Sequence, residues 1–261
     1  MPEKHVVFVT GDHEYGGEET MPPLAAELAK NYGLKTTVLK SYPDQNAEEN
    51  IPGLEALDTA DLAIFFLRWR RLPEEQVKHI EDCMKRGAAM MGFRTASHSF
   101  KYPDDHPLVH WNAWAAEAFG APPGWGNGHT HYGHDSTTDV SIMDEGKDHP
   151  VMKGVTGPFH CRSWVYHVIP MSPPADATPL LLGHPINPRT EDAEDNPVAW
   201  VWKNQHGGRV FFTTLGHPED FKEEPIVRLV VNAIHWCLDL PVPDPWKGMF
   251  KMDAPYQGMR K

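Results

Sequence analysis

The stretch AAMMGFRTA, residues 88–96, carries an apolar segment directly into a short turn. The apolar part is typical of a strand that is buried on both faces of a sheet. The turn Gly92-Phe93-Arg94-Thr95-Ala96 has the small-x-X-x-small form of a strand–turn–helix elbow, which presents its central side chain above the sheet. A nucleophile at that position would be Ser, Cys or Thr, whereas this chain has Arg94.

Strands and helices alternate on the amino-terminal side of this elbow. Apolar runs predict strands, and apolar residues at helical spacing predict helices, with Pro22 and Pro23 in the first turn of the first helix. The predicted elements cover residues 5–11, 20–31, 34–39, 62–67 and 73–86. This alternation predicts βαβ units and a doubly wound α/β fold with a mostly parallel sheet.

Between about residue 100 and residue 197 the regular alternation of predicted strands and helices is lost. We interpret this region as insertions that decorate one edge of the sheet. A helix at 108–119 and short strands at 139–143, 164–168 and 179–182 are expected there. A hairpin at 198–215 and a helix at 225–238 follow. We expect one domain over residues 1–240 and an extended C-terminal arm over residues 241–261.

Composition excludes several classes of protein. The 261 residues include 24 Lys and Arg against 36 Asp and Glu, a net charge of −12, which argues against nucleic-acid and anionic-membrane partners. The three cysteines lack CxxC spacing, so neither a disulfide framework nor a thiolate metal site is expected. No secretory signal or membrane-spanning run is present. These features predict a cytoplasmic protein with a small-molecule partner, and they leave homo-oligomerisation open.

Titratable residues follow four of the predicted strands, at the edge where open α/β sheets bind ligands. These residues are Asp12, His13, Arg68, Arg70, Arg94, His98, His217, Glu219 and Asp220, and the indole of Trp69 lies among them. We expect their segments to meet, together with His131, in one concave patch. Arg68 and Arg70 belong either to an ordinary surface cluster or to a clamp on a substrate oxyanion or on a carboxylate such as Asp12 or Glu14.

Two further groups suggest a ligand. His129, His131 and His134 are candidate metal ligands, and a third ligand for a Zn²⁺ ion could come from His13, His98 or His217. Nothing in the sequence requires a cofactor, and chance clustering among 16 histidines is the alternative. Indole rings stack on sugars, so the tryptophans in the segments after the strands or in the insertion region are candidates for binding; they are Trp69, Trp111, Trp125 and Trp164.

The elbow and the segment Gly216-His217-Pro218-Glu219 resemble class I glutamine amidotransferases, whose elbow holds a cysteine and whose His-x-Glu completes a triad. Because Arg94 replaces that cysteine, glutamine hydrolysis by this mechanism is not expected. A resemblance over nearly the whole chain is to the ThuA-like (trehalose-utilisation) family, a branch of the same superfold. The matching stretches are FVTGDH (8–13), GFRTASH (92–98), GNGHTHYG (126–133), HPV (149–151), ATPLL (177–181), PVAW (197–200) and GRVFFTTLGH (208–217).

This resemblance implies a three-layer fold, flavodoxin-like or class I glutamine amidotransferase-like, and an enzyme that acts on trehalose-type or oxidised (3-keto) sugars. On a keto sugar we predict His217 as general acid/base, oriented by Glu219 or Asp220, and His98 as the second proton-transfer group. Arg94 would stabilise an oxyanion. The predicted substrate-binding residues are Asp12, His13, Arg68, Trp69, Arg70, His131 and Trp164.

Two other functions compete with this one. The first is a hydrolase that uses Ser97 or Thr95 as nucleophile with His217 as base. The second is a sugar-binding or regulatory protein without catalytic activity, since the loss of the elbow cysteine fits it equally well.

Overall fold

The computed structural model describes residues 3–126, 129–249, 252, 254–256 and 258. Asn127 and Gly128 of the glycine–histidine stretch therefore lie outside the described residues, as do 250, 251, 253, 257 and 259–261 of the predicted arm. No helix within these ranges is long and apolar enough to cross a membrane. Cys83, Cys161 and Cys237 are buried and free.

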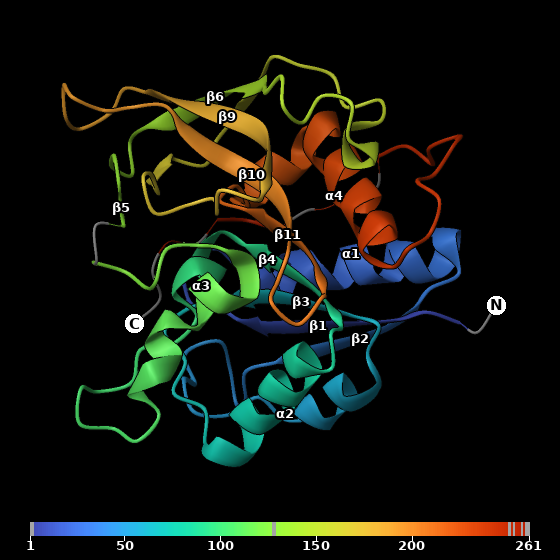
Figure 1. Ribbon diagram of the computed structural model, residues 1–261, viewed down its shortest axis with the longest axis vertical. Coiled ribbons are helices and arrows are strands. Elements are labelled where there is room, and N and C mark those ends of the chain that lie inside the picture. The colour runs from blue at the N-terminus through green and yellow to red at the C-terminus, as the bar shows by residue number, and fades with distance from the viewer. Residues whose placement is uncertain (1–2, 127–128, 250–251, 253, 257, 259–261) are drawn as a thin grey trace.

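A sheet of nine strands runs through the molecule in the order β2-β1-β3-β4-β11-β10-β9-β6-β7 (Figure 1). The first five strands are parallel and follow the flavodoxin-like order, which confirms the predicted fold class. They are β2 (Lys35–Lys40), β1 (His5–Gly11), β3 (Leu62–Leu67), β4 (Ala89–Phe93) and β11 (Arg209–Thr213).

The insertion region continues this sheet instead of only decorating its edge. The hairpin of β10 with β11 forms as predicted, and three more antiparallel strands extend the sheet beyond it. The hairpin strand is β10 (Asn196–Lys203), and the three strands beyond it are β9 (Thr178–Ile186), β6 (Thr137–Ile142) and β7 (Phe159–Cys161). The strand expected at 164–168 is only β8 (Tyr166–His167), which pairs with β5 (Thr130–His131) in a separate two-stranded sheet.

Helices cover both faces of the parallel strands (Figure 1). Val6 and Phe8 of β1 pack in one core with α1 (Gly17–Tyr32) and α4 (Glu224–Cys237). Val7 and Val9 pack on the other side with α2 (Glu74–Lys85) and α3 (Trp114–Phe119). Short 3-10 helices join these layers at Leu54–Thr59, Arg94–His98, Val109–Ala113, Pro150–Met152 and Pro218–Lys222.

Two predicted helices differ from the structure in their bounds. Helix α1 begins at Gly17, so Pro22 and Pro23 lie in its interior and not in its first turn. The earlier start arises because Gly16 adopts a left-handed conformation and its carbonyl accepts hydrogen bonds from the amides of Glu19 and Thr20. The helix expected at 108–119 is a 3-10 turn followed by the short α3.

Candidate functional site

Arg94 occupies the apex of the elbow between β4 and its 3-10 helix, with a positive φ of 44°. The elbow forms as predicted, but its side chain is fully buried instead of exposed. The guanidinium lies 4.4–4.6 Å from the ring centroids of Tyr15, Trp164 and Tyr166. Nη1 donates to the carbonyls of Thr214, at 2.7 Å, and Trp164, at 3.2 Å. The arginine is therefore a fixed positive charge inside an aromatic enclosure.

His217 lies beside this enclosure, in the loop after β11, where it caps the 3-10 helix Pro218–Lys222. Its Nδ1 accepts a hydrogen bond from the backbone N–H of Glu219 at 3.2 Å. A neutral imidazole that accepts at Nδ1 carries its proton on Nε2, so His217 presents an Nε2–H group. Burial, reinforced by Arg94, lowers the pKa of His217 to about 3, so this neutral form persists at pH 7.

The acidic neighbours of His217 act through the backbone. The carboxylate of Asp220 is fully buried and accepts from the amides of Gly216, His217 and Ser163 at 2.9–3.1 Å. The side chain of Glu219 is exposed, and it is the backbone amide of this residue that contacts the imidazole. Asp220 thus fixes the loop that carries His217.

His98 is the last residue of the 3-10 helix Arg94–His98, and its proton lies on the other ring nitrogen from that of His217. The hydroxyl of Ser97 donates to the carbonyl of Arg94 at 3.1 Å, so it accepts from Nδ1 of His98 at 2.9 Å. Nε2 of His98 is therefore a proton acceptor. Burial, reinforced by His129, lowers the pKa of His98 well below its usual value. The same bonds occupy the Ser97 hydroxyl with partners other than His217, the base that the hydrolase hypothesis requires.

His131 joins the site from β5. Its Nδ1 accepts from the amide of Gly133 at 2.9 Å, which places the proton on Nε2, and burial lowers its pKa to about 4. The rings of His131 and His134 lie 4.6 Å apart. His129 is fully buried against Trp125 and Tyr166, and burial lowers its pKa to about 3.

Trp164 connects these groups. Its ring centroid lies 5.9 Å from that of His131, 6.2 Å from that of His217 and 4.6 Å from the Arg94 guanidinium. Tyr166 bridges Arg94 to His98 on the other side, with ring centroids 6.1 Å apart. Segments far apart in the sequence therefore converge, and we call Arg94, His98, His131 and His217 with their rings Tyr15, Trp164 and Tyr166 the Arg94 cluster.

The convergence is buried and not an open patch. Arg94, His98 and His217 are at most 3% exposed, and Trp164 is 1% exposed. Tyr256, in the predicted arm, covers the imidazole of His217 with ring centroids 4.5 Å apart. Trp125 covers the opposite end, at 4.8 Å from the ring of His98.

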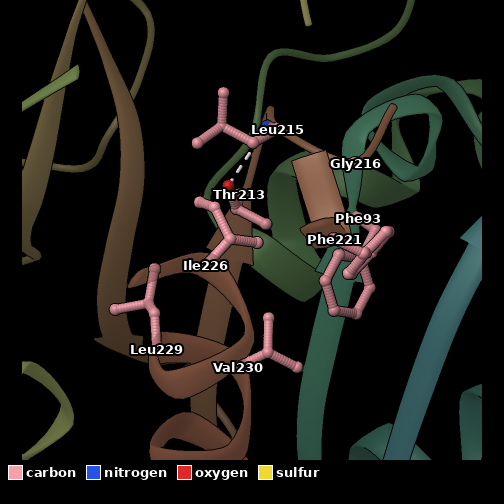
Figure 2. A pocket seen from close by; sticks show the side chains of 8 residues that line it. All are labelled: Phe93, Thr213, Leu215, Gly216, Phe221, Ile226, Leu229 and Val230. Atoms are coloured by element: carbon pink, nitrogen blue, oxygen red, sulfur yellow. Dashed lines mark hydrogen bonds between the residues drawn. The ribbon is translucent and has the colours of Figure 1, made fainter. Parts of the chain in front are cut away.

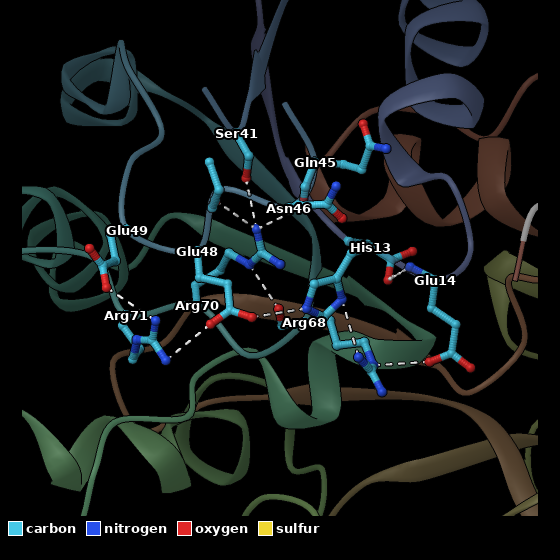
Figure 3. Close-up of polar contacts among 12 residues, drawn as sticks. His13, Glu14, Ser41, Gln45, Asn46, Glu48, Glu49, Arg68, Arg70 and Arg71 are labelled. Carbon is cyan, nitrogen blue, oxygen red and sulfur yellow. Dashed lines mark hydrogen bonds and ion pairs between the residues drawn. The ribbon is translucent and has the colours of Figure 1, made fainter. Parts of the chain in front are cut away.

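Figure 3 shows a chain of charges at the carboxyl ends of β1 and β3. It lies near the cluster, because the ring of Trp69, next to Arg68, is 6.3 Å from that of His98. Arg68 turns inward, and its Nε lies 3.0 Å from a carboxylate oxygen of Glu14, the kind of internal clamp considered from the sequence. Nδ1 of His13 is 3.1 Å from Nη1 of Arg68, and its Nε2 is 3.2 Å from Glu48. Burial, with the charges of Arg70 and Arg68, lowers the pKa of His13 to about 4.

Arg70 is a buried support for the loop after β2 (Figure 3). Its Nη1 donates to the Ser41 hydroxyl and to the carbonyls of Gln45 and Ala47 at 2.9–3.1 Å. Asp12, in the loop after β1, accepts from the amides of Glu14 and Tyr15. Burial raises the pKa of Asp12 to about 6 and that of Glu18 to about 7.

Two observations concern ligands directly. No three His, Cys, Asp or Glu side chains in the described part of the chain converge as metal ligands, so His129, His131 and His134 do not form such a group there. The cavity behind the elbow in Figure 2 has a volume of about 10 Å³. Its walls are mostly apolar, with Phe93, Leu215 and Phe221 among them, and the hydroxyl of Thr213 in its lining already bonds to the carbonyl of Val198 and the amide of Leu215.

Sequence reasoning missed Tyr15, Tyr166 and Tyr256. No local sequence pattern marks the ring of any of these three tyrosines as part of a site, because only the tertiary fold brings them beside Arg94 and His217. Trp69 was predicted to bind substrate, and its ring lies 3.5 Å from the Arg68 guanidinium and 4.3 Å from Nζ of Lys101.

Comparisons with known proteins agree with this architecture. The family model ThuA, described as trehalose utilisation, matches residues 5–237. A ThuA-like protein from Bacteroides uniformis is 19% identical with a TM-score of 0.61, and covers 90% of this chain and 91% of its own. One from Parabacteroides merdae is 14% identical with a TM-score of 0.59, over 91% and 90% of the two chains.

A third solved structure, the N-terminal domain of mmIFT52, is 11% identical with a TM-score of 0.50, over 90% of this chain and 97% of its own. At these identities the likeness concerns the fold alone. No curated protein matches the chain.

Proposed function

The chain belongs to the ThuA family, which indicates a role in carbohydrate metabolism, and we propose that it is an enzyme acting on a trehalose-type or 3-keto sugar or glycoside at the Arg94 cluster. The class of reaction would be proton transfer beside a carbonyl group. The observation that carries this proposal is the state of His217: its Nε2 is buried and has no hydrogen-bond partner among the described residues.

An unsatisfied buried donor costs about 1–3 kcal/mol. The ketone or hydroxyl oxygen of a sugar would relieve that cost by accepting from Nε2–H of His217. Trp164 offers a second donor of the same kind, because its indole Nε1 is also buried and unpaired in the described structure. Donors without partners around one fixed cation favour a ligand rich in oxygen acceptors.

The tautomers of His98 and His217 support complementary roles in such a reaction. A proton on the carbon beside the carbonyl would leave for Nε2 of His98, and the electron pair of that C–H bond would form the enolate. The enolate oxygen would be held by Nε2–H of His217 and by the positive charge of Arg94. A neutral imidazole that donates to a carbonyl oxygen is an effective electrophile when its pKa is lowered, so the low pKa of His217 suits this role.

The test is the variant His217→Asn with a 3-keto disaccharide as substrate. Asparagine is a good helix N-cap, so it can keep the hydrogen bond from the Glu219 amide while it removes Nε2–H. We expect turnover to fall about 100-fold or more with little change in the melting temperature. The exposed His160, on β7, gives the control variant His160→Asn. Unchanged turnover in His217→Asn would contradict the proposal.

A further inference from the structure

The Arg94 cluster is closed to solvent, and the C-terminal arm forms part of its cover. The ring centroid of Tyr256 is 4.5 Å from that of His217 and 5.8 Å from that of Tyr15. It is 6.3 Å from the centroid of Trp164. Tyr256 is partly exposed, whereas these three neighbours are each 1% exposed. The ring of Tyr256 therefore covers them on the side of the arm, and a ligand reaches them only if a wall of the cluster moves.

Hydrogen bonds hold the other walls on this side in place. Nη2 of Arg94 donates to the hydroxyl of Tyr15 at 3.2 Å, and Nη1 donates to the carbonyl of Trp164 at the same distance. Tyr166 belongs to β8, whose pairing with β5 fixes its backbone. Moving any of these walls breaks hydrogen bonds inside the protein, which is costly where the groups are buried.

The two covers of the cluster, Trp125 and Tyr256, differ in how they are held. Gly126, next to Trp125, donates its amide to the carbonyl of His129 at 3.1 Å. Beyond Leu240, by contrast, no residue in the described part of the chain takes part in a backbone–backbone hydrogen bond. Tyr256 meets the described residues around it through ring contacts, without a hydrogen bond or an ion pair.

The arm is fastened to the protein farther from the cluster. Nδ1 of His235 in α4 lies 2.9 Å from the carbonyl of Pro241, and Nζ of Lys153 pairs with Asp244 at 2.8 Å. Met252 is buried in the core that also contains residues of α1 and α4. The ring that covers the cluster lies beyond the last of these contacts, so it can leave the cluster while the arm stays attached.

We propose that the C-terminal arm is a lid on the Arg94 cluster, with Tyr256 moving away from His217 to admit a ligand and returning to close over it. Opening at this wall replaces ring contacts and breaks no hydrogen bond among the described residues. Closure excludes water from the proton transfer and from the charge of Arg94. This inference rests on the proposed function, because it concerns access to the same site.

The test measures how fast diethyl pyrocarbonate acylates His217 at pH 7, with each histidine resolved by peptide mass spectrometry. The readout is the rate at His217 divided by the rate at His129, which is fully buried against Trp125 on the other side of the cluster. A general loosening of the fold would raise both rates and leave the ratio unchanged. In Tyr256→Ala we expect this ratio to rise about tenfold or more, because only the local cover is lost.

Two control variants separate the ring from its hydroxyl and from tyrosine loss in general. Tyr256→Phe keeps the ring, so its ratio should stay within about twofold of wild type. Tyr42→Ala removes a tyrosine that is 63% exposed in the loop after β2, and it should leave the ratio unchanged. The lid is refuted by an unchanged ratio in Tyr256→Ala, by an equal rise in Tyr256→Phe, or by wild-type His217 reacting as fast as the exposed His160.

The lid and the proposed reaction fail separately. If the ratio rises in Tyr256→Ala while His217→Asn retains full turnover, the lid stands and the role of His217 falls. If His217→Asn loses turnover while the ratio in Tyr256→Ala stays at the wild-type value, the reaction stands and the lid falls.

Discussion

Arg94 occupies the apex of the elbow after β4 and makes most of its contacts there with aromatic rings and backbone carbonyls. Its planar guanidinium fits between three rings and donates to two backbone carbonyls. Removing any part of this arrangement leaves a charge or a carbonyl buried without a partner. The residue therefore stabilises the fold at the same point where it supplies charge to the proposed site.

We predict that Arg94→Lys destabilises the protein by about 2–4 kcal/mol, because an ammonium group cannot stack and reach both carbonyls. Urea unfolding followed by tryptophan fluorescence measures the loss. Arg209→Lys is the matched control: Arg209 also lies near an indole, Trp236, and donates to a carbonyl, but it is partly exposed. Equal effects of the two variants would refute a special stabilising role for Arg94.

The position of Arg94 at the apex of an elbow was predictable from the sequence, but the residues that surround its side chain were not. The small-x-X-x-small pattern located Arg94, because the sterics of a tight turn act over a few neighbouring residues. The three rings around it come from residues 15, 164 and 166, which only the tertiary fold brings together. The same reason explains why His217 was located but its lowered pKa was not.

At the level of elements, the packing of β4 against β11 depends on the absence of a side chain at Gly92. A Cβ atom added to Gly92 in β4 would lie 2.7 Å from the ring of Phe212 in β11. Phe212 is fully buried in the core shared with α2 and α3, so the ring has little freedom to move away.

Gly92→Ala is therefore expected to cost about 1–3 kcal/mol through overpacking between β4 and β11. The midpoint of urea unfolding measures this cost. The double variant Gly92→Ala, Phe212→Leu should recover part of the lost stability, because leucine removes the ring atoms that the new methyl group meets. A single variant as stable as wild type would show that the strands separate easily at this point.

The elements themselves were predictable to different degrees. Strand β3 was predicted with its observed bounds, since a run of six apolar residues between polar segments is a local signal. The extension of the sheet by β9, β6 and β7 was not predictable, because the residues of β6 pair with partners 19 to 49 residues away. Helix α1 was placed too late because the left-handed Gly16 that starts it leaves no periodic pattern.

For the whole molecule, the buried titratable groups predict a dependence of stability on pH. His13, His98, His129 and His217 have folded-state pKa values below the ordinary 6.5. Their contribution is present above pH 6.5 and is lost as the pH falls, since the unfolded chain binds protons first. Asp12 and Glu18 have raised values of about 6 and 7 and act oppositely, stabilising the fold as the pH falls toward 4.

With His131 included, the histidines whose pKa is lowered outnumber the two carboxyls, so the unfolded chain binds more protons than the folded chain and stability should fall between pH 6 and pH 5, by about 1.4 kcal/mol per pH unit for each excess proton. Denaturant unfolding at pH 7.5, 6.0 and 5.0 measures this slope. In His129→Phe, which has one buried imidazole fewer, the slope should be shallower. A stability that rises or stays level across this range would contradict the burial of these groups.

The nine-stranded sheet has one more consequence, for the behaviour of the protein in concentrated solution. Its two outermost strands are the places where another copy could add by backbone pairing. Strand β2 begins and ends with the exposed residues Lys35 and Lys40, and β7 has only three residues. Both edge strands therefore disfavour the addition of further chains to the sheet. In β2 the ammonium groups of two approaching copies would repel each other, and β7 is too short to pair with a long strand.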